Sequence, residues 1–514
     1  MYKLPLPRLS AKAMFDEVQT SDAQSAYTYT CHPGASSAVL VHGQLKSKTG
    51  SRGVTRAAGG RPCKIVSSPS SESYNTYCMS KNSYHYDIHG QHSDSMILHD
   101  NTATAQQQNN MDYTLPEGMH AIPLEQLDLR PDSEIDHDIL HPKPITDEKN
   151  IWFFWHSGFA TMHPYSQRGV RAWYRRLSKL GWTIRILDTQ AGSPLNVANF
   201  LDVTDTETFP KTFTDGTIGG EHARQHTSDL VRFPLLLKYG GVYADVGMLQ
   251  IGDLDRLWNQ TVGDPNSPYE VLTYSAGETD QMKITNYFLC SGRNNPLFLR
   301  AHKLFLALWN EDGGKSSTEG MHASPLLKGV PMLLQGSFTE NGRTYTPDEV
   351  SSMLTDYIIQ SQACTMAMAI EDPEDGWDGP EYVAKHVYAI EFMVGAQLIN
   401  EYTQWNGKLA FDLMSLSIPR DGERESAQQA KAREIVENCL SRSFGFKLAT
   451  GIILRVLGDT LSSLWRKHVG SDNVPGTYAY WLRHGTIYWT QDRVPPPIDW
   501  EVKTYKKGPL LRAS

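Results

Sequence analysis

Short apolar runs alternate with stretches of helical periodicity through the middle of the chain. Residues 151–155 are an apolar, aromatic run bounded by polar residues, which is typical of a buried strand. Residues 165–180 have the spacing of a helix, and residues 182–187 are a second apolar run that ends at Asp188. This succession of strand, helix and strand predicts a βαβ unit and a parallel sheet.

The stretch 226–247 has three parts: a helical segment, a Gly-Gly break and a short apolar run that ends at Asp245. Pro234 lies inside the helical segment and predicts a kink there, because proline removes a helical hydrogen bond. The apolar run predicts a strand. Asp245 is therefore expected at a strand end, where open α/β sheets bind their ligands.

Two further charged residues precede that strand. Asp229 and Arg232 are three positions apart and therefore share one face of the predicted helix. Taken alone, they are best explained as an ion pair, which contributes only about a few tenths of a kcal/mol when exposed. Asp245 changes this balance, because a charge at the end of an apolar strand is poorly explained by packing. We therefore expect the three residues to contribute to a ligand site.

The rest of the chain divides by composition. Residues 1–110 are rich in small and polar residues without sustained periodicity, which predicts a disordered extension. Residues 111–350 contain the predicted strands and are expected to form an α/β core. Residues 351–514 are predicted to be mostly helical. Within them, residues 448–465 carry apolar side chains on one broad face, and we expect this helix to pack against the core rather than lie on a membrane.

Charge and cysteine content narrow the class of protein. A formal net charge of −9 over 514 residues argues against nucleic-acid binding through bulk charge. Six cysteines without metal-ligand spacing predict free thiols in a reducing compartment. Because the chain has neither an apolar run of membrane-spanning length nor a signal-peptide core, we expect a cytoplasmic protein. The sequence leaves the oligomeric state open.

Other polar residues are candidate ligand contacts. His156 and Ser157 follow the first predicted strand, although ordinary turn polarity also explains them. His322 lies in the Gly- and Ser-rich loop 313–329, and a lone histidine is more often structural than a metal or phosphate contact. Arginines on the helix 165–180 are more often a solvated face than a diphosphate clamp. They are Arg168, Arg171, Arg175 and Arg176.

The residues around these positions resemble a known family. The block SDLVRFPLLLKYGGVYADVG resembles the sugar-nucleotide motif of glycosyltransferases of the family 32 type, SD-x-x-R followed by YGG-x-Y-x-DxD. Further stretches are similar to fungal glycosyltransferases of the capsular polysaccharide synthesis type, some of which attach sugars to small natural products such as triterpenoids. These stretches are IWFFWHSGFATMHP, GTIGG, QHTSDLVR, YGGVYADVG, TEGMHASPLLKG and DGWDGPEYVAKHVYAIEFMVG. The resemblance covers residues 111–500.

This resemblance implies a GT-A fold, a Rossmann-type αβα sandwich that binds a nucleotide-sugar. The donor-binding residues that it implies lie at the first strand end, on the predicted helix and at the next strand end. They are Trp155, His156, Ser157, Asp229, Arg232, Tyr243 and Asp245. Residues 351–514 are then expected to complete the acceptor side of the site.

The resemblance also raises the question of a metal ion. Asp245 matches the first acid of the DxD motif, but Gly247 stands where the second acid is expected. A divalent cation such as Mn²⁺ or Mg²⁺ normally stabilises the departing diphosphate, and the missing acid puts that site in doubt. Three alternatives remain. The first is that Asp245 binds a metal through water, and the second is that His322 substitutes as a metal ligand. The third is that arginine and lysine side chains neutralise the diphosphate in place of a metal.

The function implied by the resemblance is transfer of a hexose, glucose from UDP-glucose, to a hydroxyl of a small-molecule acceptor such as a triterpenoid. Candidates for the acceptor base are Asp378, Glu381 and His322. Two other hypotheses stay open. The first is that the chain is a non-catalytic binding or scaffold protein with a degraded DxD motif. The second is that its fold serves another group transfer in a natural-product pathway.

Overall fold

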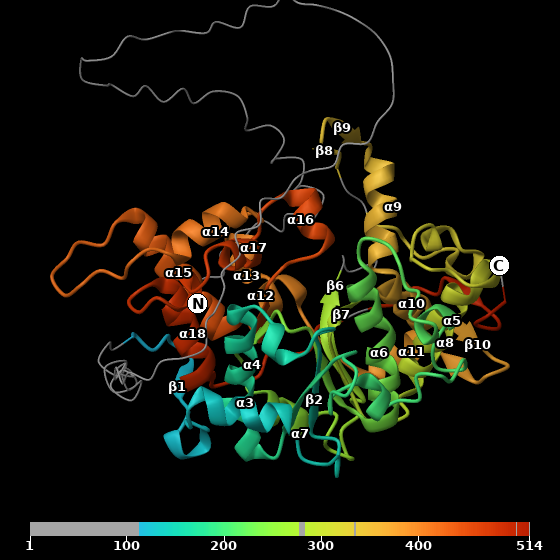
Figure 1. Ribbon diagram of the computed structural model, residues 1–514, viewed down its shortest axis with the longest axis horizontal. Coiled ribbons are helices and arrows are strands. Elements are labelled where there is room, and N and C mark those ends of the chain that lie inside the picture. Colours follow the sequence, from blue (N-terminus) through green and yellow to red (C-terminus); the bar gives the residue numbers. More distant parts are fainter. Residues whose placement is uncertain (1–112, 277–282, 334–335, 500, 513–514) are drawn as a thin grey trace, which may run out of the picture. The chain divides into compact units, whose positions relative to one another are not determined.

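The computed structural model describes residues 113–276, 283–333, 336–499 and 501–512 (Figure 1). The predicted disordered extension, residues 1–110, lies outside the described residues. None of the helices in the described ranges has the length and apolar character that a membrane span requires.

A six-stranded sheet forms the centre of the described chain. Its strands, in order across the sheet, are β12 (Val387–Ile390), β6 (Val271–Ala276), β7 (Lys283–Ser291), β4 (Gly241–Ala244), β2 (Asn150–Phe154) and β3 (Thr183–Leu187). The predicted βαβ unit is present, since β2 and β3 pair in parallel and a helix connects them. The expectation of a parallel sheet is wrong for β7, which pairs antiparallel with β4 and β6. Only residues 277–282 join β6 to β7, too few for a parallel crossover.

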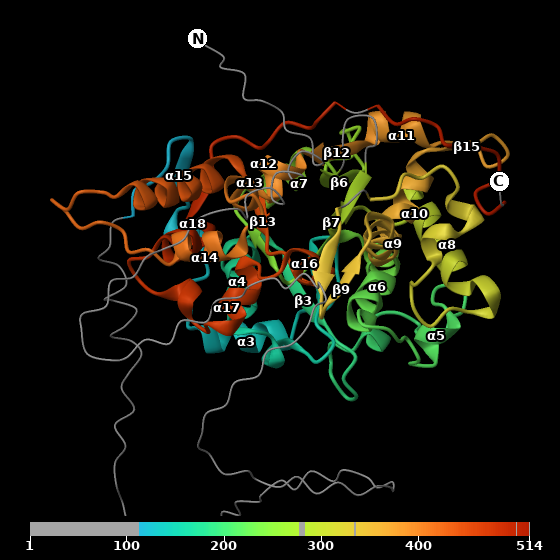
Figure 2. The ribbon, with the colours of Figure 1, turned by 90° about the horizontal axis from the view of Figure 1, so that it is seen from above.

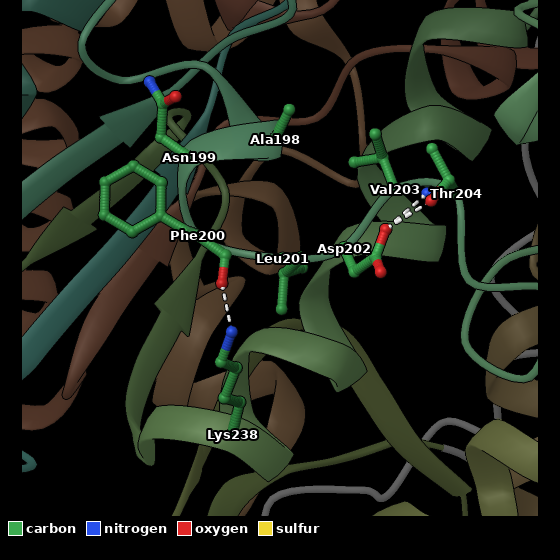
Figure 3. A pocket seen from close by; sticks show the side chains of 8 residues that line it. All are labelled: Ala198, Asn199, Phe200, Leu201, Asp202, Val203, Thr204 and Lys238. Carbon is green, nitrogen blue, oxygen red and sulfur yellow. Dashed lines mark hydrogen bonds between the residues drawn. The ribbon is translucent and has the colours of Figure 1, made fainter.

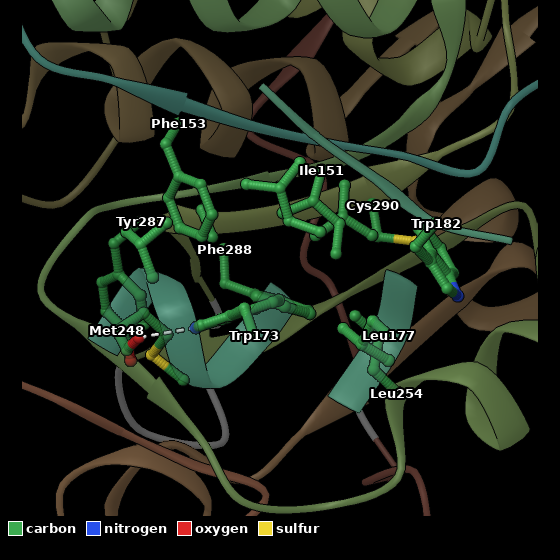
Figure 4. Packing of buried hydrophobic residues seen from close by; sticks show 14 of the residues in the cluster. Ile151, Phe153, Trp173, Leu177, Trp182, Met248, Leu254, Tyr287, Phe288 and Cys290 are labelled. Carbon is green, nitrogen blue, oxygen red and sulfur yellow. Dashed lines mark hydrogen bonds between the residues drawn. The ribbon is translucent and has the colours of Figure 1, made fainter. Parts of the chain in front are cut away.

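Strand side chains alternate between the two faces of this sheet. Ile151 and Phe153 point to one face, where Trp173 packs beside Phe153 (Figure 4), and Trp152 and Phe154 point to the other. The first face is covered by α3 (Asp132–Leu140), α4 (Pro164–Leu177) and α7 (Leu254–Gln260). The second face is covered by α6 (Ala223–Tyr239), α8 (Pro296–Asn310) and α10 (Ile359–Met368). This is the predicted Rossmann-type αβα sandwich.

The helix α6 continues without interruption through Pro234 (Figure 1). The kink predicted from this proline therefore does not break the helix. Proline removes only the hydrogen bond to the carbonyl group four residues earlier. The residues on either side of it, Phe233 and Leu235, are fully buried against the sheet and α8, and this packing holds the helix together.

The C-terminal portion is largely helical, as predicted, and it also supplies the edge strand β12. Its further helices are α9 (Pro347–Tyr357), α11 (Gly379–His386), α12 (Phe392–Ala396), α13 (Leu398–Tyr402), α14 (Gly407–Met414), α15 (Ala427–Arg442), α16 (Ile452–Leu457), α17 (Leu461–Lys467) and α18 (Tyr478–Tyr488). Several of them gather beside α4, away from α8 and α10 (Figure 2). The division at residue 350 stays a prediction. The single helix predicted over 448–465 is wrong, because Gly458, with φ 79°, separates α16 from α17.

Short sheets lie outside the central sheet of the described chain, and all but one hairpin join distant parts of the sequence. β1 (Met119–Ala121) pairs with β14 (Trp489–Gln491), and β8 (Phe338–Glu340) pairs with β9 (Arg343–Tyr345). β10 (Ile370–Asp372) lies between β11 (Trp377–Asp378) and β15 (Lys506–Lys507). β5 (Met248–Gln250) pairs antiparallel with β13 (Gly445–Lys447). This last pair brings a C-terminal strand next to the end of the 226–247 block. The short helix α5 (Lys211–Thr214) precedes that block.

His302 of α8 should make the stability of the fold depend on pH. It is buried near Phe233, and burial lowers its pKa from 6.5 to about 4. Between these two values the unfolded chain binds a proton that the folded chain does not, so stability falls as the pH decreases. We expect His302→Leu to remove about 2 kcal/mol of the stability loss between about pH 7.5 and about pH 5. Urea unfolding measures this, with exposed His137→Leu as the control. An equal loss in wild type and His302→Leu would contradict the prediction.

Candidate active site

The predicted ligand edge lies at the carboxyl ends of β2 and β4. These two strands are parallel neighbours, so Trp155 and Asp245, which follow them, emerge at the same edge of the sheet. Gly241 begins β4 with φ 98°, and a side chain there would overlap the Asn150 carbonyl oxygen. The Gly-Gly break thus allows β4 to start close beside β2, and the strand then carries Asp245 to the edge.

Asp229 and Arg232 form an ion pair in the interior. A carboxylate oxygen of Asp229 is 2.7 Å from a guanidinium nitrogen of Arg232. Only 7% of the Asp229 side chain and 4% of the Arg232 side chain are exposed. The sequence predicts that these residues contribute to a ligand site rather than only hold each other. In the folded chain they hold each other, and they reach the edge of the sheet only through their neighbours.

Polar groups from other elements complete the surroundings of this pair. The Asn286 side chain of β7 donates to Asp229 Oδ1 at 3.3 Å, and the Asn286 carbonyl oxygen accepts from Arg232. His226 Nδ1 is 3.2 Å from Asp229 Oδ2, and Gln360 of α10 donates to the Asp229 carbonyl oxygen at 2.6 Å. Both carboxylate oxygens of Asp229 therefore have protein partners. Sequence reasoning missed Asn286 and Gln360, because neither belongs to a local motif.

Tyr243 packs against the Arg232 guanidinium, whose carbon is 4.7 Å from the ring centroid. Its hydroxyl is 2.6 Å from Ser228 Oγ, and the residue is 1% exposed. Burial alone would lower the pKa of Arg232, but Asp229, Tyr243 and Asp245 together raise that pKa above its ordinary value. Arg232 is therefore a permanent buried cation, and Tyr243, predicted to bind the donor, supports it from inside the fold.

Asp245 faces outward more than Asp229 does, with 29% of its side chain exposed. One carboxylate oxygen is 3.7 Å from Arg232, and the other is 2.8 Å from Nζ of Lys447. The Asp245 backbone N–H donates to the Tyr287 carbonyl oxygen at 2.9 Å, which fixes the backbone at the strand end. Asp245 thus lies between a buried arginine and a lysine from the C-terminal portion. Sequence reasoning missed Lys447.

The side chains at Asp245 do not fit a divalent cation. Gly247 offers no carboxylate, and one oxygen of Asp245 is already paired with Lys447. Over residues 113–276, 283–333, 336–499 and 501–512, no cluster of three or more histidine, cysteine, aspartate or glutamate side chains is placed to hold a metal ion. The His322 substitution considered from the sequence therefore finds no matching set of ligands among these residues, and the water-mediated site stays a prediction.

The turn after β2 lies at the same edge as Asp245. Ser157 Oγ is 2.6 Å from the Thr161 hydroxyl, to which Trp155 Nε1 also donates at 3.2 Å. Hydrogen bonds within the turn therefore satisfy the side-chain polar atoms of Trp155 and Ser157. Burial, followed by the nearby charge of Arg224, lowers the pKa of His156, which favours the neutral ring. In the described part of the chain no side chain or backbone group forms a hydrogen bond with the His156 ring, which leaves its nitrogens available to a ligand.

His322 lies in a loop that reaches the start of α6. Thr318 of this loop is 3.2 Å from His226 Nε2, so the 313–329 loop approaches the interior ion pair. His322 itself is held by α9, because its Nδ1 and its backbone N–H both lie 2.8 Å from Asp356 Oδ1. Within the residues that the structure describes, no contact joins His322 to Asp245.

Asp378 and Glu381 are placed at a different end of the core. Asp378 caps α11 by accepting from the Glu381 N–H at 2.9 Å, and the exposed Glu381 pairs with Lys385. Trp377, next to this cap, donates to the Ala367 carbonyl oxygen in the last turns of α10. The other end of α10 carries Gln360, which touches Asp229. The length of α10 therefore separates these two acids from the interior ion pair.

The arginines of α4 are bound within the protein, and neither interpretation made from the sequence applies to them. Arg168 pairs with Asp472, Arg171 with Asp136 and Arg175 with Asp132, and the buried Arg176 donates to backbone carbonyl groups of residues 250–252. Arg171 and Arg175 thereby tie α4 to α3. Because these guanidinium groups have protein partners, they form neither a solvated face nor a free diphosphate clamp.

Two surface hollows lie away from this edge. One is lined by residues 198–204 and by Lys238, which donates to the Phe200 carbonyl oxygen at 2.7 Å (Figure 3). Lys238 is in the last turn of α6, beyond the middle of the helix from Asp229. The other hollow is lined by α8 and by residues 509–511. Neither hollow includes a residue of the candidate site.

A family model and several known proteins match the chain in sequence. The family model for capsular polysaccharide synthesis proteins matches residues 120–315. The chain is 33% identical to O-glycosyltransferase braB of Annulohypoxylon truncatum, over 75% of this chain and 90% of that protein. It is 33% identical to glycosyltransferase afumC of Aspergillus fumigatus, over 73% and 95%, and 30% identical to O-glycosyltransferase PaGT of Phomopsis amygdali, over 74% and 92%.

Among solved structures, the chain is similar to the glycosyltransferase PaToxG at 15% identity, over 36% of this chain and 68% of that chain, with a TM-score of 0.23. That superposition carries no argument. The sequence relatives match over nearly their whole length and show the family. The chain belongs to the capsular polysaccharide synthesis type of fungal glycosyltransferases and is a glycosyltransferase.

Proposed function

We propose that this glycosyltransferase moves glucose from UDP-glucose to a hydroxyl group of a small natural product such as a triterpenoid. The observation that carries the proposal is Asp245, a partly exposed carboxylate between Arg232 and Lys447 at the carboxyl end of β4. Nucleotides bind at this edge in open α/β sheets, as in the GT-A fold that we assign here. Two relatives named O-glycosyltransferase support an oxygen atom as the acceptor.

In this reaction the bond between C1 of glucose and the β-phosphate oxygen breaks, and its electron pair leaves with UDP. The acceptor oxygen forms the new bond to C1, and its proton passes to the departing diphosphate or to water. We assign donor contacts to Asp245 and to the turn that contains His156. Asp229, Arg232 and Tyr243 hold Asp245 from the interior and position it.

The cellular location belongs to the same proposal. Cys290, Cys364 and Cys439 are buried free thiols. Free thiols are ordinary in a reducing compartment, and they support a cytoplasmic enzyme that meets its donor there.

Calorimetric titration with UDP-glucose, together with an assay for released UDP, tests the function. We expect saturable binding and slow hydrolysis of the donor without acceptor, and faster UDP release when a hydroxylated acceptor is added. GDP-mannose is the matched control and should bind more weakly. Binding without any turnover would favour the non-catalytic hypothesis that Gly247 motivates. No binding of any nucleotide-sugar would overturn the proposal.

A further inference from the structure

We propose that Lys447 binds the diphosphate of the donor and supplies the positive charge for which related sites use a divalent cation. This inference rests on the proposed function, because it concerns the same donor. It assigns a substrate-contacting role to a residue that lies outside the matched 120–315 segment. It also gives a physical reason for glycine at position 247.

The register of two short strands places Lys447 at the site. β13 pairs antiparallel with β5, and Lys447 is opposite Met248, the residue after Gly247. The Leu448 N–H donates to the Gly247 carbonyl oxygen at 2.9 Å, which extends the pairing by one residue. The backbone of β13 therefore fixes the position from which the Lys447 side chain reaches the end of β4.

Gly247 leaves room for this lysine. A Cβ atom built at Gly247 would be 3.5 Å from Lys447 Nζ and 3.3 Å from the Leu448 carbonyl oxygen. A carboxylate at position 247 would lie within ion-pairing reach of the ammonium group and would take up donors that a ligand could otherwise use. The second acid of a DxD motif would thus compete with the diphosphate for the Lys447 ammonium. Glycine at this position leaves those donors to the ligand.

The ammonium group has hydrogen-bonding capacity to spare. Lysine carries three N–H donors, and among the described residues Asp245 is the one ionic partner of the Lys447 ammonium group. The ring of Tyr287 lies on another side, with its centroid 5.7 Å from Nζ. Because 13% of the side chain is exposed, a ligand at the edge of the sheet can reach the remaining donors. Asp245 orients the ammonium rather than covering it.

A departing diphosphate needs this kind of fixed charge. When the C1–O bond breaks, its electron pair increases the negative charge on the β-phosphate. A preorganised cation therefore stabilises the transition state more than it stabilises the bound donor in its ground state. Lys447 is preorganised in this sense, because the pairing of β13 with β5 holds its backbone in place. Burial, followed by the charge of an exposed arginine, lowers the pKa of His156 and of His163. The arginines are Arg224 for His156 and Arg466 for His163, so further cations lie near the same edge.

The test compares UDP with uridine, which has the same base and ribose but no phosphate. We measure both dissociation constants by calorimetry for wild type, Lys447→Met and Lys447→Arg, in EDTA and in Mn²⁺. Wild type should bind UDP equally well in both buffers. Lys447→Met should weaken UDP binding about 10- to 100-fold, the value of a charge-assisted contact. Its uridine binding should stay unchanged. Lys447→Arg should retain most of the UDP affinity.

Each other outcome has a defined meaning. If wild type binds UDP only in Mn²⁺, or if Lys447→Met binds UDP as wild type does, the role of Lys447 is overturned and the proposed function stands. Equal weakening of UDP and uridine would assign Lys447 a structural role and also overturn the inference. If wild type binds UDP and uridine in neither buffer, the proposed function fails with it.

Discussion

Replacing Asp245 with asparagine is expected to lower kcat/KM for glucosyl transfer by about 100- to 1000-fold, the usual cost of removing one preorganised electrostatic group. The substitution keeps the shape of the side chain and removes its charge. Arg232 and Lys447 would then face an amide instead of a carboxylate. The ammonium of Lys447 loses the group that orients it, and the donor loses its polar contact at the end of β4.

The measurement is the rate of UDP release with an acceptor identified in the UDP-release assay. The UDP affinity and the apparent melting temperature of each variant are measured alongside it. Asp412→Asn is the matched control, because Asp412 also pairs with a lysine but on an exposed turn of α14. We expect wild-type kinetics for it. Full transfer activity in Asp245→Asn would refute the assignment of the site. A large fall in melting temperature for Asp245→Asn alone would instead indicate damage to the fold.

The core of the fold was predictable because its elements carry strong local patterns. The aromatic run of β2 and the apolar run of β3 are buried on both faces, and such strands are recognisable as continuous apolar segments. The direction of β7 was not predictable from its own residues, since strand direction depends on the connection before it. Apolar spacing over 448–465 resembled one helix, but Gly458 adopts a backbone conformation that ends α16.

The candidate site was predictable only where it is local in the sequence. The Gly-Gly break, β4 and Asp245 follow one another, so their spatial relation could be inferred from the spacing. Lys447 could not be found in this way, because the pairing of β5 with β13 joins segments that are far apart in the chain. The missing acid at Gly247 put the metal site in doubt and left three alternatives open, one of them a cationic side chain, but it could not identify Lys447.

The sequence also could not show how the other candidate residues are placed in the fold. Asp229 and Arg232 share a helix face, as the spacing indicated, but the spacing could not show that α10 and β7 would enclose them. Asp378 and Glu381 are acidic residues in a stretch that resembles the family. Their position depends on α11 following α10, and that arrangement is visible only in the folded chain.

The interior ion pair leads to the largest expected effect on stability. Arg232→Met should destabilise the protein by about 3–5 kcal/mol, because it leaves the Asp229 carboxylate buried without its main cation. Asp229 is 7% exposed, and its remaining partners, His226 and Asn286, do not replace a guanidinium charge. Adding Asp229→Asn removes that uncompensated charge. The double variant should therefore be more stable than Arg232→Met alone.

This double-mutant cycle separates a charge effect from a packing effect. If charge dominates, the two substitutions are coupled, and the double variant recovers about 1–3 kcal/mol relative to the sum of the single changes. If loss of the stacked contact with Tyr243 dominates, the changes add and nothing is recovered. Urea unfolding of wild type and the three variants decides between them. Arg433→Met is the control. Arg433 lies on the exposed face of α15 and pairs with two glutamates, so its replacement should lower the free energy of unfolding by about 0.5 kcal/mol or less. Additive losses would show that the buried charge of Asp229 is tolerated without Arg232.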